Sequence, residues 1–362
     1  MRKTDAMKSF ARVWFGLALL AAVAAAGCSR IAPGSWPGVG VDDETVWVAY
    51  QQQVHAVARN TGALRWSFPQ EPERNRLFFA PPRLTADGQR LIVGGYDKVL
   101  YALDPNTGAV QWTFDRAQDR YIGAVLVTPN AIYAPNADGT LYALEPNGQL
   151  RWTFTTQAAL WAPPATDGQR LYLASMDHHL YALDAATGKE LWRLKMEGAL
   201  TSTPTLLDGV LYVGELATQV AAVDAAQGQV LWQTPTDAWV WHSPTPLGDD
   251  ALVVGDMEGQ VYALARGDGQ VRWQTEVPGG VIGAPAVVED TVFVTTRQGQ
   301  LVALDAASGA VKWTKALAEA AIEAGPLPVP ELGLLVAPSD PKAPLLAVRS
   351  DGALVWSLTF EK

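Results

Sequence analysis

Residues 100–112 read LYALDPNTGAVQW, and copies of this stretch return along the 362-residue chain. Residues 180–192 read LYALDAATGKELW, and residues 301–313 read LVALDAASGAVKW. Each copy ends at a tryptophan, and the eight are Trp66, Trp112, Trp152, Trp192, Trp232, Trp273, Trp313 and Trp356. The intervals between them are 46, 40, 40, 40, 41, 40 and 43 residues. Eight copies at a period near 40 residues predict a solenoid or a propeller.

The unit at residues 160–194 distinguishes a propeller from a solenoid. It reads LWAPPATDGQRLYLASMDHHLYALDAATGKELWRL. A short segment follows the Pro-Pro pair, and TDG, SMDH and DAATG are turn sequences that separate RLYLA, HLYALD and KELWRL. Four short antiparallel strands without a helical stretch are typical of one propeller blade. We therefore predict an all-β fold, an eight-bladed β-propeller of four-stranded antiparallel blades over residues 36–362.

The repeat also assigns a role to its tryptophans. Both faces of the LYALD strand are apolar, so this strand must be covered on both sides, as it is between two neighbouring blades. A tryptophan on the outermost strand offers a large ring that packs on the adjacent blade, and its N–H then needs an acceptor, such as a turn carbonyl there. We interpret all eight repeat tryptophans as structural.

The N-terminus has the layout of an export signal. Four basic residues stand among the first twelve, and residues 13–27 read VWFGLALLAAVAAAG, an apolar run too short to span a bilayer comfortably. Residues 25–28, AAGC, resemble the bacterial lipobox, although Ala25 stands where leucine is usual. We expect a signal peptide at 1–27, lipid on Cys28 and a short lipidated linker at 28–35. The alternative is a plain signal peptide cut after AAA, which leaves a free cysteine.

Charge and cysteine content exclude several classes of function. The formal net charge is −10, so the chain should repel nucleic acid and anionic headgroups. Cys28 is the single cysteine, so no intramolecular disulfide forms. We expect an exported monomer that reaches the membrane through its lipid.

The pattern LYALD-x-x-TG-x-x-x-W resembles the quinoprotein-like propeller repeat, named for pyrroloquinoline quinone (PQQ). The resemblance covers nearly all of residues 31–362 and implies an eight-bladed ring. Its enzymes carry an adjacent Cys-Cys pair and a Glu/Asn/Asp set on calcium. This chain has no such pair, and its four histidines (His55, His178, His179 and His242) are scattered. We therefore expect neither PQQ nor calcium, and no metal site.

Eight such blades behind a lipobox are similar to the propeller lipoproteins of the outer-membrane barrel-assembly machinery. The resemblance implies a non-enzymatic scaffold that is lipid-anchored to the cell envelope and binds a partner protein. It would face the periplasm from an outer membrane, or lie on the outer face of the cytoplasmic membrane where there is only one. Two alternatives stay open: a PQQ-dependent dehydrogenase-like enzyme, and a propeller that binds a small molecule or glycan.

Candidate binding residues lie in the segments that precede each unit's innermost strand, which read for example LFFAPP, ALWAPP and WVWHSP. Side chains there that are outside the repeat consensus should converge on one end of the central channel. They are Phe78, Phe79, Tyr121, Trp161, Trp239, Trp241, His242 and Glu323. They predict an aromatic-lined pocket or a partner hot spot; the alternative is that they only plug the axis.

Two further segments stand out. Residues 69–76, PQEPERNR, form a charged insertion that lengthens the first interval, and such a loop carries partner contacts or is simply tolerated on the surface. Residues 266–268 read RGD, but they fall where other units have the Asp-x-x-x-Gly turn. Turn chemistry accounts for the RGD triplet.

Overall fold

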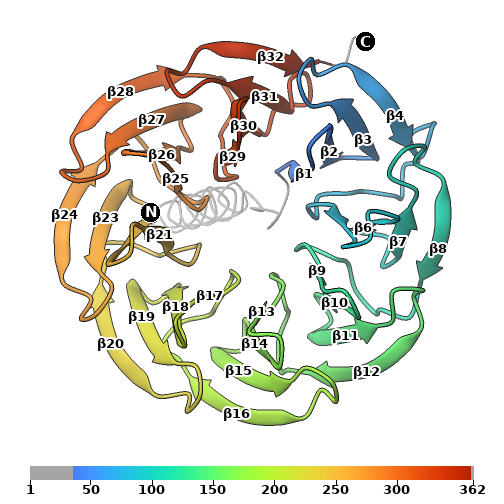
Figure 1. The fold of residues 1–362 in the computed structure, drawn as a ribbon, viewed down its shortest axis with the longest axis horizontal. Helices are drawn as coiled ribbons and strands as arrows, with labels where there is room; N and C mark the ends of the chain where they lie inside the picture. The colour runs from blue at the N-terminus through green and yellow to red at the C-terminus, as the bar shows by residue number, and fades with distance from the viewer. Residues whose placement is uncertain (1–35, 360–362) are drawn as a thin grey trace, which may run out of the picture. The chain divides into compact units, whose positions relative to one another are not determined.

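A computed structural model describes residues 36–359, which form a ring of eight four-stranded sheets (Figure 1). Each sheet follows the chain order, from an innermost strand at the centre to an outermost strand at the rim. The predicted eight-bladed, all-β propeller is confirmed. Within these residues no helix is long and apolar enough to cross a membrane. The predicted signal peptide, Cys28 and the linker at 28–35 lie outside the described residues.

Blades 1 to 4 occupy the first half of the ring. Their strands are β1 (Gly38–Val41), β2 (Thr45–Tyr50), β3 (Gln53–Ala58) and β4 (Leu64–Phe68); β5 (Arg83–Leu84), β6 (Leu91–Gly94), β7 (Leu100–Leu103) and β8 (Val110–Phe114); β9 (Leu126–Val127), β10 (Ile132–Pro135), β11 (Thr140–Leu144) and β12 (Leu150–Thr155); β13 (Ala165–Thr166), β14 (Arg170–Ala174), β15 (His179–Asp184) and β16 (Glu190–Lys195).

Blades 5 to 8 complete it. Their strands are β17 (Thr205–Leu207), β18 (Val210–Glu215), β19 (Gln219–Asp224) and β20 (Val230–Pro235); β21 (Thr245–Leu247), β22 (Ala251–Gly255), β23 (Gln260–Ala265) and β24 (Val271–Glu276); β25 (Ala286–Val288), β26 (Thr291–Thr295), β27 (Gln300–Asp305) and β28 (Val311–Ala316); β29 (Leu327–Val329), β30 (Gly333–Val336), β31 (Leu345–Val348) and β32 (Leu354–Leu358).

The hydrophobic core lies between blades. All four residues of β7 are buried, as the two-sided apolar pattern of LYAL requires. One cluster, for example, joins Trp47 and Val54 of blade 1 to Leu91 and Tyr101 of blade 2. Burying one such side chain contributes about 1.5–3 kcal/mol, so each blade is stabilised mainly by its neighbours.

The repeat sequence builds the contact between blades. In the second copy, Ala102 of β7 lies opposite Trp112 of β8, and every blade pairs an alanine with its tryptophan in this way. The turn that follows β7 is an Asx-turn, in which Asp104 Oδ1 accepts from the N–H of Thr107 at 2.9 Å. Gly108 closes this turn with φ of 72°, directly against the Trp66 ring of the preceding blade. The small residues leave room for each large ring.

Six of the eight indole N–H groups donate to a carbonyl in the turn of the next blade, at 2.9–3.2 Å. The acceptors are the carbonyls of Pro105, Pro146, Ala225, Arg266, Ala306 and Arg59. The RGD triplet is one of these turns: the Arg266 carbonyl accepts from Trp232, and Gly269 has a φ of 73°. These six tryptophans thus each bond a blade to its successor.

The ring closes without exchange of a strand. Blade 1 and blade 8 are each built from continuous sequence, at Gly38–Phe68 and Leu327–Leu358. Trp356 of blade 8 donates to the Arg59 carbonyl of blade 1 at 2.9 Å, and its ring lies on Gly62. The same tryptophan contact that joins consecutive blades therefore closes the circle.

Candidate functional site

Seven linkers join the outermost strand of one blade to the innermost strand of the next, and two backbone hydrogen bonds hold each in place. In the linker to blade 3, the Tyr121 N–H donates to the Gly95 carbonyl of blade 2 at 3.2 Å. The Arg120 carbonyl accepts from the N–H of Ala137 in blade 3 at 3.1 Å. The pair recurs in all seven linkers. Each linker thus bridges two adjacent blades at the hairpins that connect their second and third strands.

These two backbone hydrogen bonds, which we call the linker clamp, determine which linker side chains are buried. The residue that donates its N–H is apolar in every linker and at most 1% exposed; the seven are Phe78, Tyr121, Leu160, Leu200, Val240, Val281 and Ile322. Two predicted channel residues, Phe78 and Tyr121, are therefore core residues instead. Phe78 packs on Phe68 and Tyr101 at ring distances of 5.9 and 5.7 Å.

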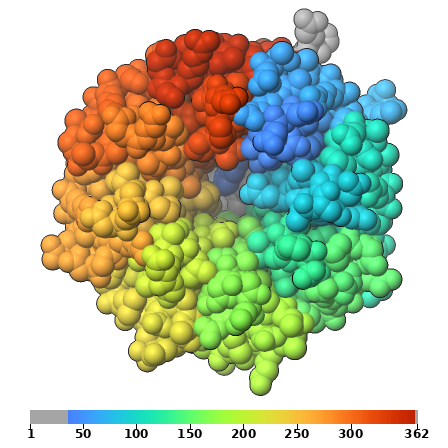
Figure 2. Space-filling view, viewed as in Figure 1, coloured from blue at the N-terminus to red at the C-terminus, as the bar shows by residue number. Residues whose placement is uncertain are grey.

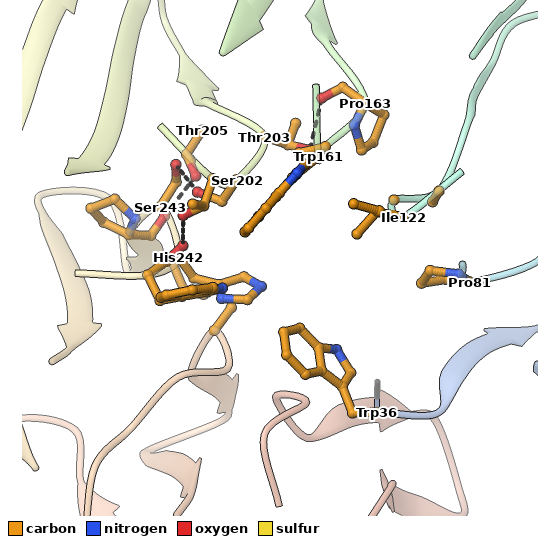
Figure 3. Close-up of a pocket in the computed structure, with 18 of the residues that line it drawn as sticks. Trp36, Pro81, Ile122, Trp161, Pro163, Ser202, Thr203, Thr205, His242 and Ser243 are labelled. Atoms are coloured by element: carbon orange, nitrogen blue, oxygen red, sulfur yellow. Dashed lines mark hydrogen bonds between the residues drawn. The ribbon is translucent and has the colours of Figure 1, made fainter. Parts of the chain in front are cut away.

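In five of the seven linkers the next residue lines a pocket; these are Phe79, Ile122, Trp161, Thr201 and Trp241. The ring is hollowed at its centre (Figure 2). Phe79, Trp161 and Trp241 line this pocket, whose volume is about 370 Å³, together with His242. Trp36, which precedes β1, and Ile122 complete its aromatic and apolar wall (Figure 3). We call this the central pocket; the full lining is Trp36, Phe79, Pro81, Arg83, Ile122, Gly123, Ala124, Trp161, Ala162, Pro163, Thr201, Ser202, Thr203, Thr205, Trp241, His242, Ser243, Pro244, Thr245, Pro246 and Ala284.

Two tryptophans from non-adjacent blades meet in this wall. The rings of Trp161 and Trp241 lie 6.2 Å apart with an interplanar angle of 39°. Between them, the linker of blade 5 carries the small Thr201 at the equivalent position, and Thr201 Oγ1 donates to the Trp241 carbonyl at 2.6 Å. The large–small–large order therefore lets the two indoles form one tilted surface.

Hydroxyl groups tie the linkers together around the pocket. Thr203 Oγ1 donates to the Pro163 carbonyl at 2.9 Å, and Thr205 Oγ1 donates to the Pro244 carbonyl at 2.6 Å. The hydroxyls of Ser202 and Ser243 are 2.9 Å apart and share one hydrogen bond (Figure 3). Since the segments that lead into blades 4, 5 and 6 are bonded to one another, this part of the pocket wall is preorganised.

His242 is held in one tautomer. Its Nδ1 lies 2.5 Å from the Ile282 carbonyl, which can only accept, so Nδ1 carries the proton. Burial lowers the pKa of His242 below its usual value, which favours the neutral ring. Nε2 is then left as an acceptor, and the imidazole faces the central pocket beside Trp161 and Trp36 (Figure 3).

Arg83, at the start of β5, is the one permanently charged side chain in the lining. Among residues 36–359 it makes no ion pair or side-chain hydrogen bond, although it stands where Thr205 and Thr245 stand in their own blades. The Arg83 side chain is exposed to solvent on the pocket wall, and a guanidinium remains protonated at any physiological pH. The central pocket therefore holds one uncompensated positive charge.

The other two predicted residues lie outside this lining. Glu323 occupies the equivalent linker position of blade 8, but its carboxylate pairs with Arg297 at 3.7 Å, and burial raises its pKa. Trp239 is 50% exposed at the outer end of its linker, where its carbonyl accepts from the Met257 N–H. Of the eight predicted residues, the structure thus brings together Phe79, Trp161, Trp241 and His242.

Sequence reasoning missed Trp36, Arg83 and the Ser202–Ser243 pair. Trp36 precedes the first innermost strand just as the linkers precede the other seven, so its position in the period was a usable signal. The aligned linkers carry a second signal. One position is apolar in all seven, whereas the residue after it varies from tryptophan to threonine to glutamate. Arg83 had no such signal, since it sits on a strand.

The lining offers little to a calcium-bound quinone. None of the described residues that line the central pocket has a carboxylate, the ligand that calcium prefers, and residues 36–359 contain no group of three or more His, Cys, Asp or Glu side chains arranged for a metal. The donor set of this described lining does not fit that cofactor.

Comparison with known proteins identifies the family. The sequence profile described as outer membrane protein assembly factor BamB matches residues 29–159, 137–239 and 216–362. The chain belongs to the BamB family. No curated protein sequence gives a match.

Solved structures with the same fold include BamB from Moraxella catarrhalis, at a TM-score of 0.71 and 20% identity over 85% of this chain and 92% of that one. The computationally designed Ika8 protein has a TM-score of 0.72 at 16% identity, over 91% and 97% of the two chains. Sqt1 from Saccharomyces cerevisiae has a TM-score of 0.71 at 12% identity, over 85% and 93%. At these identities the likeness concerns the fold alone.

Proposed function

We propose that this protein is a scaffold of the cell envelope, anchored by lipid on Cys28, that binds a partner protein in outer-membrane protein assembly and performs no chemistry. The observation that carries the proposal is the match to the BamB family, which begins at residue 29, directly after the lipobox cysteine, and runs to residue 362.

The architecture suits such a role. Inter-blade tryptophans and the linker clamp hold eight blades in one ring, so surface loops sit on a frame that does not depend on them. Trp239 is exposed on this frame and lies next to Met257 of the adjacent hairpin. Tryptophan and methionine are enriched at protein interfaces, and a half-exposed tryptophan is a fitting anchor. We place a partner contact at Trp239.

A site-specific photocrosslinker tests this contact in living cells. The benzophenone amino acid replaces Trp239 in one strain and Gln111, which is exposed on outer strand β8, in a control strain. We expect a crosslink to a component of the outer-membrane assembly machinery from position 239 and none from position 111. Recovery of no envelope assembly protein from position 239, or the same products from both positions, would contradict the proposal.

A further inference from the structure

The composition of the central pocket restricts what it can bind. Indole and phenyl rings cover several sides, Arg83 supplies one positive charge, and burial lowers the pKa of His242, which favours its neutral ring. Among the described residues, no aspartate, glutamate, asparagine or glutamine lines the pocket. The wall therefore combines aromatic rings with hydroxyl groups and carries a single cation that has no partner among residues 36–359.

We propose that the central pocket binds a monocarboxylate with an aromatic or apolar body, whose carboxylate pairs with Arg83 and whose body packs against Trp161 and Trp241. This site goes beyond the proposed scaffold function and does not depend on it. The chemistry is met equally by a free small acid and by the C-terminal residue of a polypeptide.

Charge decides between ligand classes. A guanidinium gains most from a carboxylate or phosphate, because the fork of N–H donors matches two oxygens. A cationic ligand would meet Arg83 with no carboxylate nearby to offset the repulsion. A multiply charged anion would bring two or more negative charges to a single cation. A ligand with one carboxylate therefore matches the single positive charge of Arg83.

Hydrogen-bonding capacity argues against a neutral sugar. Four threonine hydroxyls of the lining already donate to carbonyls of neighbouring linkers, and no described lining residue has a carboxylate or amide side chain to bond vicinal hydroxyls. What remains available is one proton of the Ser202–Ser243 pair, His242 Nε2 and the indole N–H groups of Trp36, Trp161 and Trp241, which make no hydrogen bond among residues 36–359. Most of these groups donate, which suits a ligand whose polar end accepts, such as a carboxylate.

Volume sets the size of the body. About 370 Å³ is near the lower end of the usual range for ligand pockets. One aromatic ring with a short acid chain fits this space, and packing on the tilted pair of indoles would contribute beyond the buried area. We therefore choose 3-phenylpropionate as the probe and 3-phenylpropionamide as its neutral match.

The test is a titration of the purified full chain by calorimetry and tryptophan fluorescence. We expect saturable binding of 3-phenylpropionate and at least tenfold weaker binding of the amide, because a charged hydrogen bond contributes about 1.5–3 kcal/mol. Arg83→Gln should weaken binding of the acid by about tenfold or more while leaving the amide unchanged. The control is Arg193→Gln, an exposed arginine of outer strand β16, which should change neither.

A second pair of variants tests the aromatic wall. Trp161→Ala should abolish fluorescence quenching by the acid, and Trp239→Ala should preserve it, because Trp239 lies outside the pocket. Thermal unfolding of each variant shows whether it is folded. If Trp161→Ala does not fold, the affinity of Arg83→Gln for the acid tests the proposal on its own. Equal affinity for acid and amide, an unchanged affinity in Arg83→Gln, or no binding of the acid would each overturn the proposal.

The tripeptide Ala-Ala-Phe distinguishes the two sources of the carboxylate. Tighter binding of this peptide than of 3-phenylpropionate, lost on C-terminal amidation, would support a polypeptide end as the ligand. Equal or weaker binding would support a free acid. The crosslinking at position 239 is independent of either result, so failure of the pocket proposal and failure of the scaffold proposal can be told apart.

Discussion

The Trp356 indole donates to the Arg59 carbonyl at 2.9 Å, and this bond joins residues that are 297 positions apart. It links the last blade to the first, and Arg59 also donates back across the seam to the Pro330 carbonyl. Buried residues of both blades, among them Val57 and Leu335, pack in one cluster there. The ring is therefore closed by side chains and by turn carbonyls, which makes this seam the point where its integrity is most easily tested.

Trp356→Ala should destabilise the protein by about 3–5 kcal/mol, the usual cost of removing a buried tryptophan, because the seam loses both its packing and its hydrogen bond. Urea unfolding followed by circular dichroism measures the loss. Trp239→Ala is the matched control, and since Trp239 is half exposed we expect a change of about 0.5 kcal/mol or less. Similar losses in the two variants would show that the seam does not depend on Trp356.

Two glycines with the same backbone conformation allow the cost of backbone strain to be measured separately from the cost of a steric clash. Gly88 and Gly108 have φ of 68° and 72°, but an added Cβ at Gly88 meets nothing within 4 Å, whereas at Gly108 it would lie 2.6 Å from the Trp66 ring. Gly88→Ala should cost about 1 kcal/mol from backbone strain alone. Gly108→Ala should cost about 1–3 kcal/mol more, because the ring must move. Denaturant midpoints compare the two, and equal costs would contradict docking of Trp66 on this turn.

His55 should make the fold sensitive to mild acid. Burial lowers its pKa to about 4, so the folded state binds a proton less readily than the unfolded state, where the pKa is about 6.5. Its contribution to stability is complete above pH 6.5 and is lost as the pH falls toward 4, by about 3 kcal/mol over that window. In His55→Gln, the difference in unfolding free energy between pH 7 and pH 4.5 should shrink by a comparable amount. Parallel pH profiles for the two proteins would refute this assignment.

Lipidation of Cys28 follows from the proposed function. Cells grown with an alkyne-tagged fatty acid should incorporate label into the wild-type protein and none into Cys28→Ser, because the thiol is the attachment point. Ser29→Ala is the control and should be labelled normally. Label retained in Cys28→Ser would rule out a lipobox at residues 25–28 and favour the plain signal peptide.

Much of the fold was readable from internal repetition. Strands, turns and the tryptophan contact are written into each copy: β-forming and apolar residues favour strands, and Asp and Gly set the turn. The direction of the tryptophan contact, toward the next blade, emerged only from the structure. The sequence also left open how the ring is clasped, because contacts between its two ends have no local signature.

The site was predicted less completely. The linkers do contribute side chains to the central pocket, but Phe78 and Tyr121, which we expected at the axis because an aromatic residue outside the consensus suggests function, lie in the core. The two backbone hydrogen bonds of each linker place the residue that donates its N–H in the core, and in five linkers the residue after it lines the central pocket. An aromatic residue is suited to either environment, so residue type alone did not separate them.

The sequence by itself determined the number of blades, the order of strands within each and the tryptophan that ends every unit, because all three depend on interactions within one period or with the next. Only the tertiary structure decided that Trp161 and Trp241 touch across an intervening blade, that Arg83 joins them in the central pocket, and that Trp356 completes the ring on Arg59. These relationships depend on the curvature accumulated over several blades, and no single repeat encodes it.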